Sequence, residues 1–327
     1  MTPPKHLIPR GRARVRVPAS TSNLGPGFDV LGLALQLYNE VEIEILRPGT
    51  PLQIEIEGEG ACDLARDRTN LVVQSAFRGI PTVLPSQFKG VILGGADAPL
   101  RIRMVNRIPL ARGLGSSAAA RLAGILAMRA LFSGWEEELD PLMMEACRLE
   151  GHPDNVAASF FGGLCAVMHE GERLHVAQVN VPRDLGAVVC IPNFELPTAK
   201  ARAVLPNRVS LGDAVKTASR VSFLLAAIEQ RRYGWLKTAM LDVVHQPYRR
   251  QLVPGLYRVI DAALKAGAYG AALSGAGPSV FAFAPRGPRG AMIGRAMQKA
   301  FLAARVESRY QVLDIDRGGV SVEHLDP

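Results

Sequence analysis

Cysteine is scarce in this sequence, and its spacing excludes several common kinds of site. The chain has 327 residues and four cysteines, and no two of them stand in a C-x-x-C pattern. This spacing excludes zinc ribbons and thioredoxin-type redox motifs. Isolated cysteines of a cytosolic protein are typically reduced, and we expect buried, reduced thiols at Cys62, Cys147, Cys165 and Cys190.

Long hydrophobic runs are also missing. No stretch reaches the roughly 18 uncharged apolar residues that indicate a membrane span. The longest candidate, Ala118 to Phe132, is interrupted by Arg121 and Arg129. No apolar run of signal-peptide type follows the basic residues near the N-terminus. We therefore expect a cytoplasmic protein that does not associate with a membrane.

Acidic residues are in the minority. The chain has 38 Lys and Arg against 30 Asp and Glu, a formal net charge of +8, which suggests nucleic acid, a membrane or a phosphorylated ligand as partner. However, aromatic residues make up only 6% of the chain, and no RNP-type motif occurs. Nucleic-acid binding is therefore not expected. We interpret Arg12, Arg14 and Arg16 as a stripe of solvated surface.

The sequence does contain a mixture of strand and helix patterns. Alternation over 12–17, 40–46 and 52–57 predicts strands, and the break at 47–51 predicts a hairpin between the last two. Asp154 is expected to cap a short helix that stops at Gly162. Further strands are expected at 101–105, 185–191, 271–274, 280–284 and 308–313, and the last of these is expected to be the final strand. Helices are expected at 71–80, 116–132, 141–151, 211–232, 235–244, 255–265 and 292–304. Because these elements do not alternate strictly, the pattern predicts an α+β architecture. The length predicts two domains, which we divide between about 165 and 185.

The most distinctive segment is the loop Gly113-Leu114-Gly115-Ser116-Ser117, which precedes an Ala-rich helix. Glycines let backbone N–H groups approach an anion, and a helix N-terminus adds unsatisfied donors and the positive end of a dipole. The loop is neither a Walker A motif nor G-x-G-x-x-G, because Gly-Lys-[Ser/Thr] and a third glycine are missing. It predicts a triphosphate-binding loop, with an ordinary N-capped core helix as the alternative.

Three other segments are rich in turn-forming or polar residues. Tight turns alone explain residues 18–29, which present Asn23 and Asp29, and residues 273–281, which join two short strands. Residues 150–155 (EGHPDN) bring carboxylates, an imidazole and an amide together, and capping by Asp154 leaves Glu150 and His152 unexplained. Zinc is not expected there, because no second His or Cys stands at ligand spacing.

Together these segments resemble the GHMP kinase superfamily over nearly the whole chain. The order matches: a substrate loop, a central P-x-x-x-G-L-G-S-S-A loop and a late S-G-A-G-P-S loop. Within the superfamily the sequence is most similar to the homoserine kinases. The matching segments are NLGPGFD at 23–29, LEGHPDNV at 149–156, PTAKARAVLP at 197–206 and HQPYR at 245–249.

The resemblance implies transfer of the ATP γ-phosphate to the side-chain hydroxyl of L-homoserine, a step toward threonine, with Mg²⁺ as the metal. It implies a two-domain α+β GHMP kinase fold: an ATP-binding domain at 1–175, like ribosomal protein S5 domain 2, and a ferredoxin-like domain at 176–327. Members of the family often dimerise, so a homodimer is an additional expectation.

The resemblance also implies roles for individual residues. The ATP site comprises Asn70, near the adenine, and Pro109, Leu110, Ala111, Arg112, Gly113, Leu114, Gly115, Ser116, Ser117, Ala118 and Ala119. The metal ligands are Ser117 and Glu150. The substrate residues are Asn23, Asp29, His152, Asn155, Thr198, Arg202 and Arg249, where the arginines suit a carboxylate and Asp29 suits an ammonium group.

Two questions stay open at the level of sequence. The catalytic residues are Asp154 and Asn155, either with Asp154 as a proton acceptor or with orientation by Asn155 sufficient for a loose phosphoryl-transfer transition state. The alternative functions are another small-molecule kinase of the superfamily, for example of the mevalonate type, and an S5-like nucleic-acid-binding protein. An Asp29 pocket has no use in binding mevalonate, which lacks an ammonium group.

Overall fold

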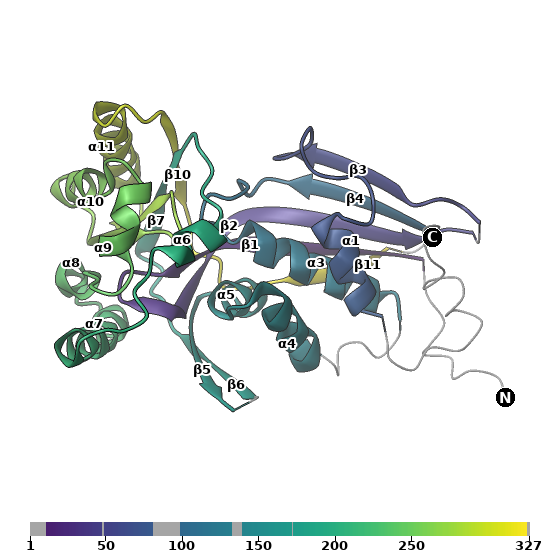
Figure 1. Cartoon of the computed structure of the whole chain (residues 1–327), viewed down its shortest axis with the longest axis horizontal. Helices are drawn as coiled ribbons and strands as arrows, with labels where there is room; N and C mark the ends of the chain where they lie inside the picture. Colours follow the sequence, from purple (N-terminus) through teal and green to yellow (C-terminus); the bar gives the residue numbers. More distant parts are fainter. Residues whose placement is uncertain (1–10, 48, 81–98, 133–138, 172, 326–327) are drawn as a thin grey trace.

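The protein forms two β-sheets with helices packed against them, which confirms the predicted α+β class. The computed structural model describes residues 11–47, 49–80, 99–132, 139–171 and 173–325 (Figure 1). The first sheet has the order β11-β1-β2-β4-β3, and β5 joins it through β2 and carries β6. Its strands are β1 (Arg12–Asn23), β2 (Gly27–Ile45), β3 (Gln53–Gly58), β4 (Leu100–Asn106), β5 (Leu164–Glu170), β6 (Arg173–Val179) and β11 (Ser321–Leu325).

The second sheet is antiparallel, with the order β10-β7-β9-β8. Its strands are β7 (Leu185–Pro192), β8 (Gly270–Leu273), β9 (Val280–Pro285) and β10 (Ser308–Leu313). The helices are α1 (Leu71–Arg78), α3 (Ser116–Ala130), α4 (Leu139–Glu150), α5 (Asp154–Phe161), α6 (Thr198–Ala203), α7 (Leu211–Glu229), α8 (Leu236–Ala239), α9 (Gln246–Arg249), α10 (Leu256–Lys265) and α11 (Arg289–Ala303). Of the helices that the structure describes, none combines the length and the apolar character that a membrane crossing requires.

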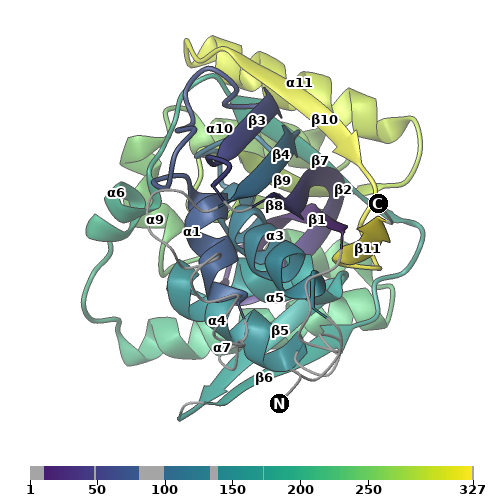
Figure 2. The same ribbon diagram turned by 90° about the vertical axis from the view of Figure 1, so that its right-hand side faces the viewer.

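Each sheet is covered by its own group of helices. Helices α3 and α5 contact β1 and β2 of the first sheet, and α1 and α4 pack against α3. Helices α10 and α11 cover one face of the second sheet (Figure 2). The hydrophobic core also connects the two sheets, because side chains of β9 alternate between its faces. Val280 and Ala282 pack with α10 and α11, whereas Phe281 and Phe283 belong to the same buried cluster as the core of the first sheet.

The predicted hairpin between 40–46 and 52–57 is wrong. Strand β3 does not pair with β2; β4 lies between them, antiparallel to β2 and parallel to β3. The physical reason is charge. Both β2 and β3 carry glutamates on their solvated face, and like charges opposite each other destabilise a sheet. The basic strand β4 neutralises both neighbours: Arg101 bonds Glu44 at 2.9 Å, and Arg103 bonds Glu57 at 2.8 Å.

Four smaller expectations also need correction. Pro153, not Asp154, occupies the N-cap of α5, and Asp154 is its first residue. Residues 240–244 follow α8 without helical structure. Strand β10 is not the last one, since β11 returns to the first sheet beside β1. All four cysteines are free, as expected, but Cys62 is exposed because it lies in the turn after β3.

The predicted domain boundary at residue 175 stays a prediction, and the strand pairing favours a different boundary. Residues 173–179 form β6 of the first sheet, and β11 belongs to the same sheet although it follows the second one in the chain. We therefore propose that the first domain extends to the end of β6 and also includes the C-terminal strand.

Candidate active site

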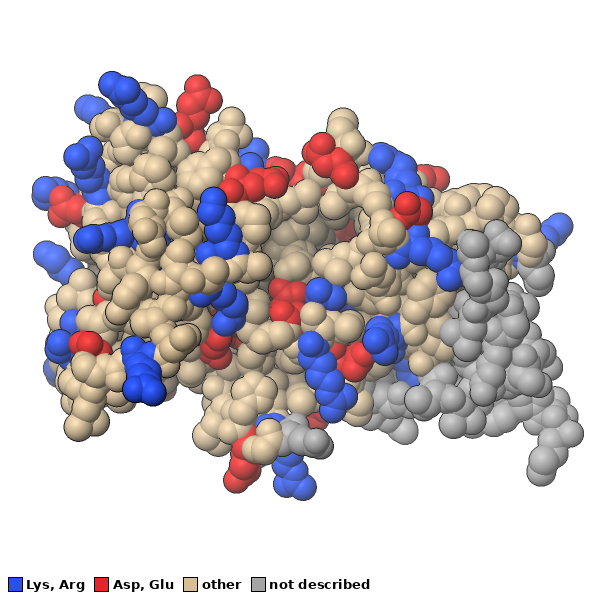
Figure 3. Space-filling view, in the orientation of Figure 1, with Lys and Arg blue, Asp and Glu red and all other residues tan. Residues whose placement is uncertain are grey.

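Nearly all the residues singled out from the sequence line one cleft between the two sheets. The cleft has a volume of about 410 Å³, and a hollow between the two halves is visible in the space-filling view (Figure 3). Three residues predicted for the ATP site are absent from its lining. Ala118 and Ala119 point into the core, and Pro109 is buried beside the loop. The lining includes Asn23, Asp29, Asn70, Leu110 to Ser117, Glu150, His152, Asp154, Asn155, Thr198, Arg202 and Arg249.

The glycine-rich loop ends at an uncapped helix. Gly113 and Gly115 adopt φ values of +72° and +70°, which favour glycine. Gly115 is the N-cap of α3, no side chain caps the helix, and its first turn contains no acidic residue. The first N–H groups of α3 therefore stay available for an anion. This geometry favours the phosphate-binding interpretation over that of an ordinary N-capped core helix.

The late glycine-rich segment holds this loop in place. The Ser274 hydroxyl donates to the Gly113 carbonyl at 2.6 Å and lies 2.8 Å from Oγ1 of Thr21. The Gly275 N–H donates to the carbonyl of Ser22 at 3.1 Å. Residues 273–281 are thus more than a turn, because they join the substrate loop to the phosphate-binding loop.

The side chain of Asn70 is held by two hydrogen bonds. Its Oδ1 caps α1 by accepting the Val72 N–H at 2.9 Å, and its Nδ2 donates to the carbonyl of Ala65 at 2.8 Å. Asn70 also lines the cleft beside the phosphate-binding loop. The structure therefore shows the helix-capping role directly and leaves the adenine contact as a prediction.

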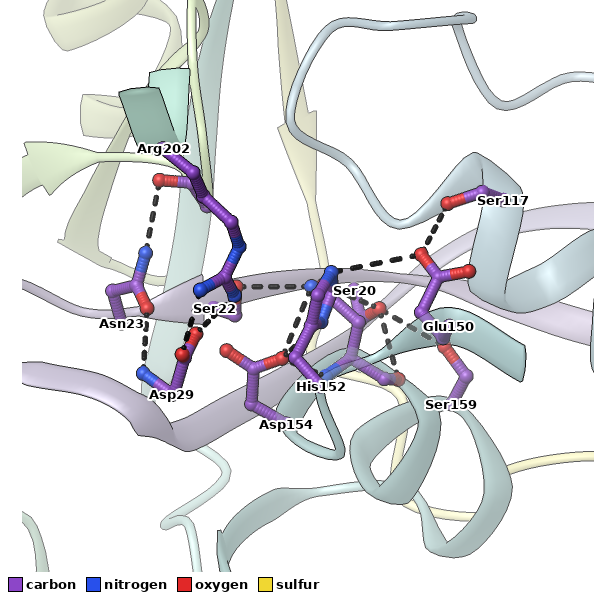
Figure 4. A network of polar contacts seen from close by, with 12 residues as sticks. Ser20, Ser22, Asn23, Asp29, Ser117, Glu150, His152, Asp154, Ser159 and Arg202 are labelled. Carbon is purple, nitrogen blue, oxygen red and sulfur yellow. Dashed lines mark hydrogen bonds and ion pairs between the residues drawn. The ribbon is translucent and has the colours of Figure 1, made fainter. Parts of the chain in front are cut away.

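At one end of the cleft, Ser117 and Glu150 lie together beside the first turn of α3 (Figure 4). The Ser117 hydroxyl donates to Oε1 of Glu150, and Arg121 Nε donates to Oε2 at 2.7 Å. These are two hard oxygen donors beside the uncapped N-terminus of α3. Among the described residues, no group of three or more His, Cys, Asp or Glu side chains is placed to hold a metal. The donor set fits Mg²⁺, which takes its remaining oxygens from phosphate and water.

His152 and Asp154 occupy the middle of the cleft. His152 Nδ1 lies 2.9 Å from Asp154 Oδ1, and its Nε2 lies 3.7 Å from Glu150 Oε1. Burial alone would lower the pKa of His152. The hydrogen bond to Asp154 and the charges of Asp154 and Glu150 outweigh burial and raise that pKa. The imidazole of His152 therefore lies between two carboxylates, both of which favour its protonated form.

The amide of Asn155 is fixed by buried hydroxyl groups. Its Oδ1 accepts from Ser20 at 3.0 Å, and its Nδ2 donates to Ser22 Oγ at 3.0 Å. Ser159 donates to Ser20 at 3.0 Å and extends the chain of hydroxyls. The orientation of the amide is thus determined by its neighbours.

The other end of the cleft carries the charges predicted for an amino acid. The Asp29 carboxylate accepts a bidentate pair of hydrogen bonds from Arg202, at 2.7 and 3.0 Å. Asn23 accepts the Asp29 N–H at 3.1 Å and donates to the Gly275 carbonyl at 2.9 Å. Asp29 and Arg202 thus neutralise each other here, which the sequence did not indicate. Thr198 lines the cleft as the first residue of α6, the helix that carries Arg202.

Arg249 is buried beneath this ion pair. Its Nε donates to the Ala201 carbonyl at 3.1 Å, and its Nη1 donates to the Gly275 carbonyl at 3.0 Å. Burial and the nearby charge of Arg202 lower the pKa of Arg249 to about 10, so the guanidinium stays charged at neutral pH. The ring of Phe28 lies 5.4 and 5.3 Å from the guanidinium carbons of Arg202 and Arg249. Both cations therefore contact one aromatic ring.

Several contributors to the site were missed at the sequence level. Ser20 and Ser22 stand in a segment that looked like a loop but forms the end of β1. Arg121 could have been found, since it follows Ser117 by four residues and so lies on the same face of the helix. Phe28 and Ser274 act through contacts between segments far apart in the chain, for which the sequence carries no spacing signal.

Comparison with known proteins agrees with the geometry. The model for the GHMP kinase N-terminal domain matches residues 83–163, and that for the GHMP kinase C-terminal domain matches residues 224–303. The homoserine kinase of Carboxydothermus hydrogenoformans is 43% identical over 90% of this chain and 91% of its own. That of Persephonella marina is 40% identical over 96% of this chain and 99% of its own.

Solved structures give the same result. A crystal structure of homoserine kinase from Cytophaga hutchinsonii superposes with a TM-score of 0.81 and 32% identity, covering 96% of this chain and 98% of that one. Mevalonate kinase from L. major shares the fold, with a TM-score of 0.66 and 16% identity, covering 96% of this chain and 99% of that one. The predicted two-domain GHMP kinase fold is confirmed, and the chain belongs to the homoserine kinases of the GHMP kinase family.

Proposed function

We propose that this chain transfers the γ-phosphate of ATP to the side-chain hydroxyl of L-homoserine, forming O-phospho-L-homoserine. The observation that carries the proposal is the pairing of two unlike subsites in one cleft. An uncapped helix N-terminus lies at one end, and a carboxylate with two guanidinium groups lies at the other. The first suits a polyphosphate, and the second suits a small zwitterion.

The nucleotide subsite is formed by backbone groups. The N–H groups at the start of α3 and the loop from Gly113 to Ser117 would hold the phosphates, because glycine geometry exposes them to the cleft. Ser117 and Glu150 would hold Mg²⁺, which when bound neutralises charge on the phosphates. Glu150 is kept in place by Arg121, so its carboxylate does not depend on the ion for its position.

The acceptor subsite recognises both charges of an amino acid. In the structure Asp29 and Arg202 satisfy each other, and their side chains are 33% and 37% exposed. Such a half-exposed ion pair contributes little free energy, so a ligand can replace it. The ammonium group of homoserine would take the place of Arg202 on Asp29, and its carboxylate would take the place of Asp29 on Arg202. A ligand with one charge would leave a partner unpaired.

The chemical step depends mainly on orientation. The Asp154 carboxylate already accepts from the Asn155 N–H at 2.7 Å and lies against His152. Asn155 is held by Ser20 and Ser22, which keeps a fixed amide beside the transfer position. A loose transition state makes little early demand for removal of the hydroxyl proton. We therefore assign Asp154 the task of holding His152 and Asn155.

Replacing Asp154 by asparagine distinguishes the two roles. If Asp154 orients its neighbours, kcat of Asp154→Asn should fall by about 10- to 100-fold. Steady-state kinetics with L-homoserine measure this, with circular dichroism as the check on folding. A loss of about 10⁴-fold with unchanged substrate binding would contradict the assignment and identify Asp154 as the base.

The proposal as a whole is tested by a coupled ATPase assay with L-homoserine, mevalonate and galactose as acceptors. We expect turnover of L-homoserine that depends on Mg²⁺, and little with the other two. Turnover of mevalonate without turnover of homoserine would overturn the proposal. A cytoplasmic location remains a prediction from the sequence, and a homodimer remains one from the family. Cell fractionation measures the first, and light scattering of the purified chain measures the second.

A further inference from the structure

The segment His245 to Arg249 was singled out from the sequence, yet the site described so far uses only Arg249. His245 is completely buried and lies between that arginine and the substrate loop. Its Nε2 lies 2.7 Å from the carbonyl oxygen of Gly25, and its Nδ1 lies 3.3 Å from Nη1 of Arg249. Its ring centroid is 5.5 Å from that of Phe28.

These contacts determine the protonation of the imidazole. A carbonyl oxygen only accepts, so Nε2 carries the proton and donates to Gly25. A guanidinium only donates, so Nδ1 has a free lone pair and accepts from Arg249. The ring is therefore neutral, although its Nε2 also lies 3.5 Å from the buried Oδ2 of Asp242. Burial, the largest cause, and the charge of Arg249 lower the pKa of His245 to about 4, although the charge of Asp242 opposes them.

The backbone around His245 is anchored on both sides. The buried carboxylate of Asp242 accepts the N–H groups of Val244, His245 and Gln246 at 2.6 to 2.8 Å. The Gln246 side chain accepts the Leu273 N–H at 2.7 Å, which ties the segment to β8. The imidazole thus projects from a rigid base toward the cleft.

On the other side, Gly25 lies in the turn between β1 and β2. Asn23 is the last residue of β1, and Asp29 is the third residue of β2. Gly25 has φ of +92°, and an added Cβ would overlap the carbonyl of Met240, so the turn also packs closely against the chain before His245. The Nε2 hydrogen bond fixes this turn relative to Arg249.

We propose that His245 is a positioning residue for the acceptor subsite, which sets the spacing between the substrate loop and the Arg249 guanidinium. It does this with both ring nitrogens and does not touch the reacting atoms. The inference rests on the proposed function, because the spacing matters for a ligand whose ammonium and carboxylate groups must reach both sides. The nucleotide subsite lies at the other end of the cleft, and neither ring nitrogen of His245 contacts its loop, so we expect it to be affected less.

Two variants separate the two hydrogen bonds. In His245→Gln the terminal amide reaches the Nε2 position and can donate to Gly25, but the Nδ1 acceptor is lost. In His245→Asn the amide stands near the Nδ1 position and can accept from Arg249, but it does not reach Gly25. His175→Gln is the control, because His175 lies exposed on β6, where its ring pairs with Glu170.

We expect each His245 variant to raise the KM for L-homoserine about 10-fold or more, with the KM for ATP changed less than about twofold. The His175→Gln control should match the wild type. Combining His245→Gln with Arg249→Lys should add little to the effect of Arg249→Lys alone, because the histidine acts through the arginine. Urea unfolding of each variant establishes that it is folded.

The inference is overturned if both folded variants keep the wild-type KM for homoserine, or if the KM values of both substrates rise together. Full additivity with Arg249→Lys would also overturn it. Failure of the proposed function looks different, since the wild type itself would then not turn over homoserine.

Discussion

At the acceptor end of the cleft, the charges of Asp29 and Arg202 neutralise each other, whereas the positive charge of Arg249 is held by neutral groups. Asp29 and Arg202 come from opposite sides of the cleft and bond each other through two hydrogen bonds. Arg249 is fixed by two carbonyl groups and a histidine. Selectivity at this site is therefore expected to depend on exchanging a protein ion pair for two ligand ion pairs.

Asp29→Asn tests that exchange. The variant should lose about 100-fold in kcat/KM for L-homoserine, since an amide does not replace a carboxylate opposite an ammonium group. It should lose much less with 4-hydroxybutyrate, which has the carboxylate and hydroxyl but no ammonium group. The ratio of the two kcat/KM values is the measurement.

The control for Asp29→Asn is Asp261→Asn, which removes an exposed carboxylate that pairs with Lys265 on α10. This control should leave the ratio unchanged. An equal loss with both acceptors in Asp29→Asn would contradict the exchange.

Glu150→Gln tests the proposed metal ligand. The amide keeps the size of the side chain but removes the negative charge, so the Mg²⁺ concentration for half-maximal activity should rise about 10-fold. Titration of activity with Mg²⁺ at fixed ATP measures this. Glu145→Gln, on the same helix but paired with Arg78 and Arg148, should behave as the wild type. An unchanged Mg²⁺ requirement in Glu150→Gln would remove this residue from the metal site.

At the scale of residues, the sequence indicated which side chains meet but not how they are paired. Asn23, Asp29, Arg202 and Arg249, which were predicted to bind one substrate, line the same cleft. The ion pair between Asp29 and Arg202 was not predictable, because it joins residues 173 positions apart. Pairing of this kind depends on how the two sheets are placed, which no local pattern records.

The phosphate-binding loop shows how elements depend on one another. Three glycine-rich segments meet there, and Gly113 lies so close to Ser274 that an added Cβ would overlap its carbonyl oxygen. The third segment looked like a simple turn from its sequence. Its role follows from the antiparallel pairing of β8 and β9, which places the turn between them against the loop.

Gly113→Ala should raise the KM for ATP at least about 10-fold, because the loop must move away from Ser274 and the φ of +72° is unfavourable for alanine. Steady-state kinetics with ATP as the variable substrate measure this. Gly171→Ala is the matched control, since Gly171 also has a positive φ, +59°, but no atom lies within 4 Å of its added Cβ. Similar ATP KM values for the two variants would show that close packing of the loop is not needed.

The order of the strands was predicted less well than the strands themselves. Alternation of apolar residues located the two acidic segments correctly, but proximity in the chain suggested the wrong neighbour. The basic pattern of β4 was the signal that could have corrected it, because Arg101 and Arg103 match glutamates on both sides. Charge complementarity between strands is thus more informative here than the length of the connecting loop.

At the scale of the whole molecule, the net charge of +8 says little about the ligand. The basic stripe near the N-terminus lies at the surface, as predicted, with the Arg12 and Arg14 side chains 42% and 40% exposed. Arg12 and Arg14 also bond Glu42 at 3.3 and 2.9 Å, and Arg16 lies over the ring of Tyr38. Basic and acidic side chains are spread over the visible face (Figure 3). The charges on which the proposed function depends are the few inside the cleft.

The stability of the whole molecule should depend on pH through His245. Its pKa is about 4 in the folded protein and 6.5 as the ordinary value. Below pH 6.5 the unfolded chain therefore takes up a proton that the folded chain excludes, and stability falls as the pH decreases toward 4. Between pH 7 and pH 5 this costs about 2 kcal/mol of unfolding free energy. His152 acts in the opposite direction, because its raised pKa stabilises the fold at low pH and that contribution is lost as the pH rises.

Comparison of the wild type with His245→Gln isolates the first contribution, because His152 is present in both proteins. Urea unfolding at pH 7 and pH 5 should show that the wild type loses about 2 kcal/mol more than the variant between the two pH values. The variant is expected to be less stable at pH 7, where the neutral imidazole makes both of its hydrogen bonds. The difference in unfolding free energy between the variant and the wild type should be smaller at pH 5. Equal losses in the two proteins would mean that His245 takes up a proton without leaving its place, which would contradict the neutral ring on which the spacing of the acceptor subsite depends.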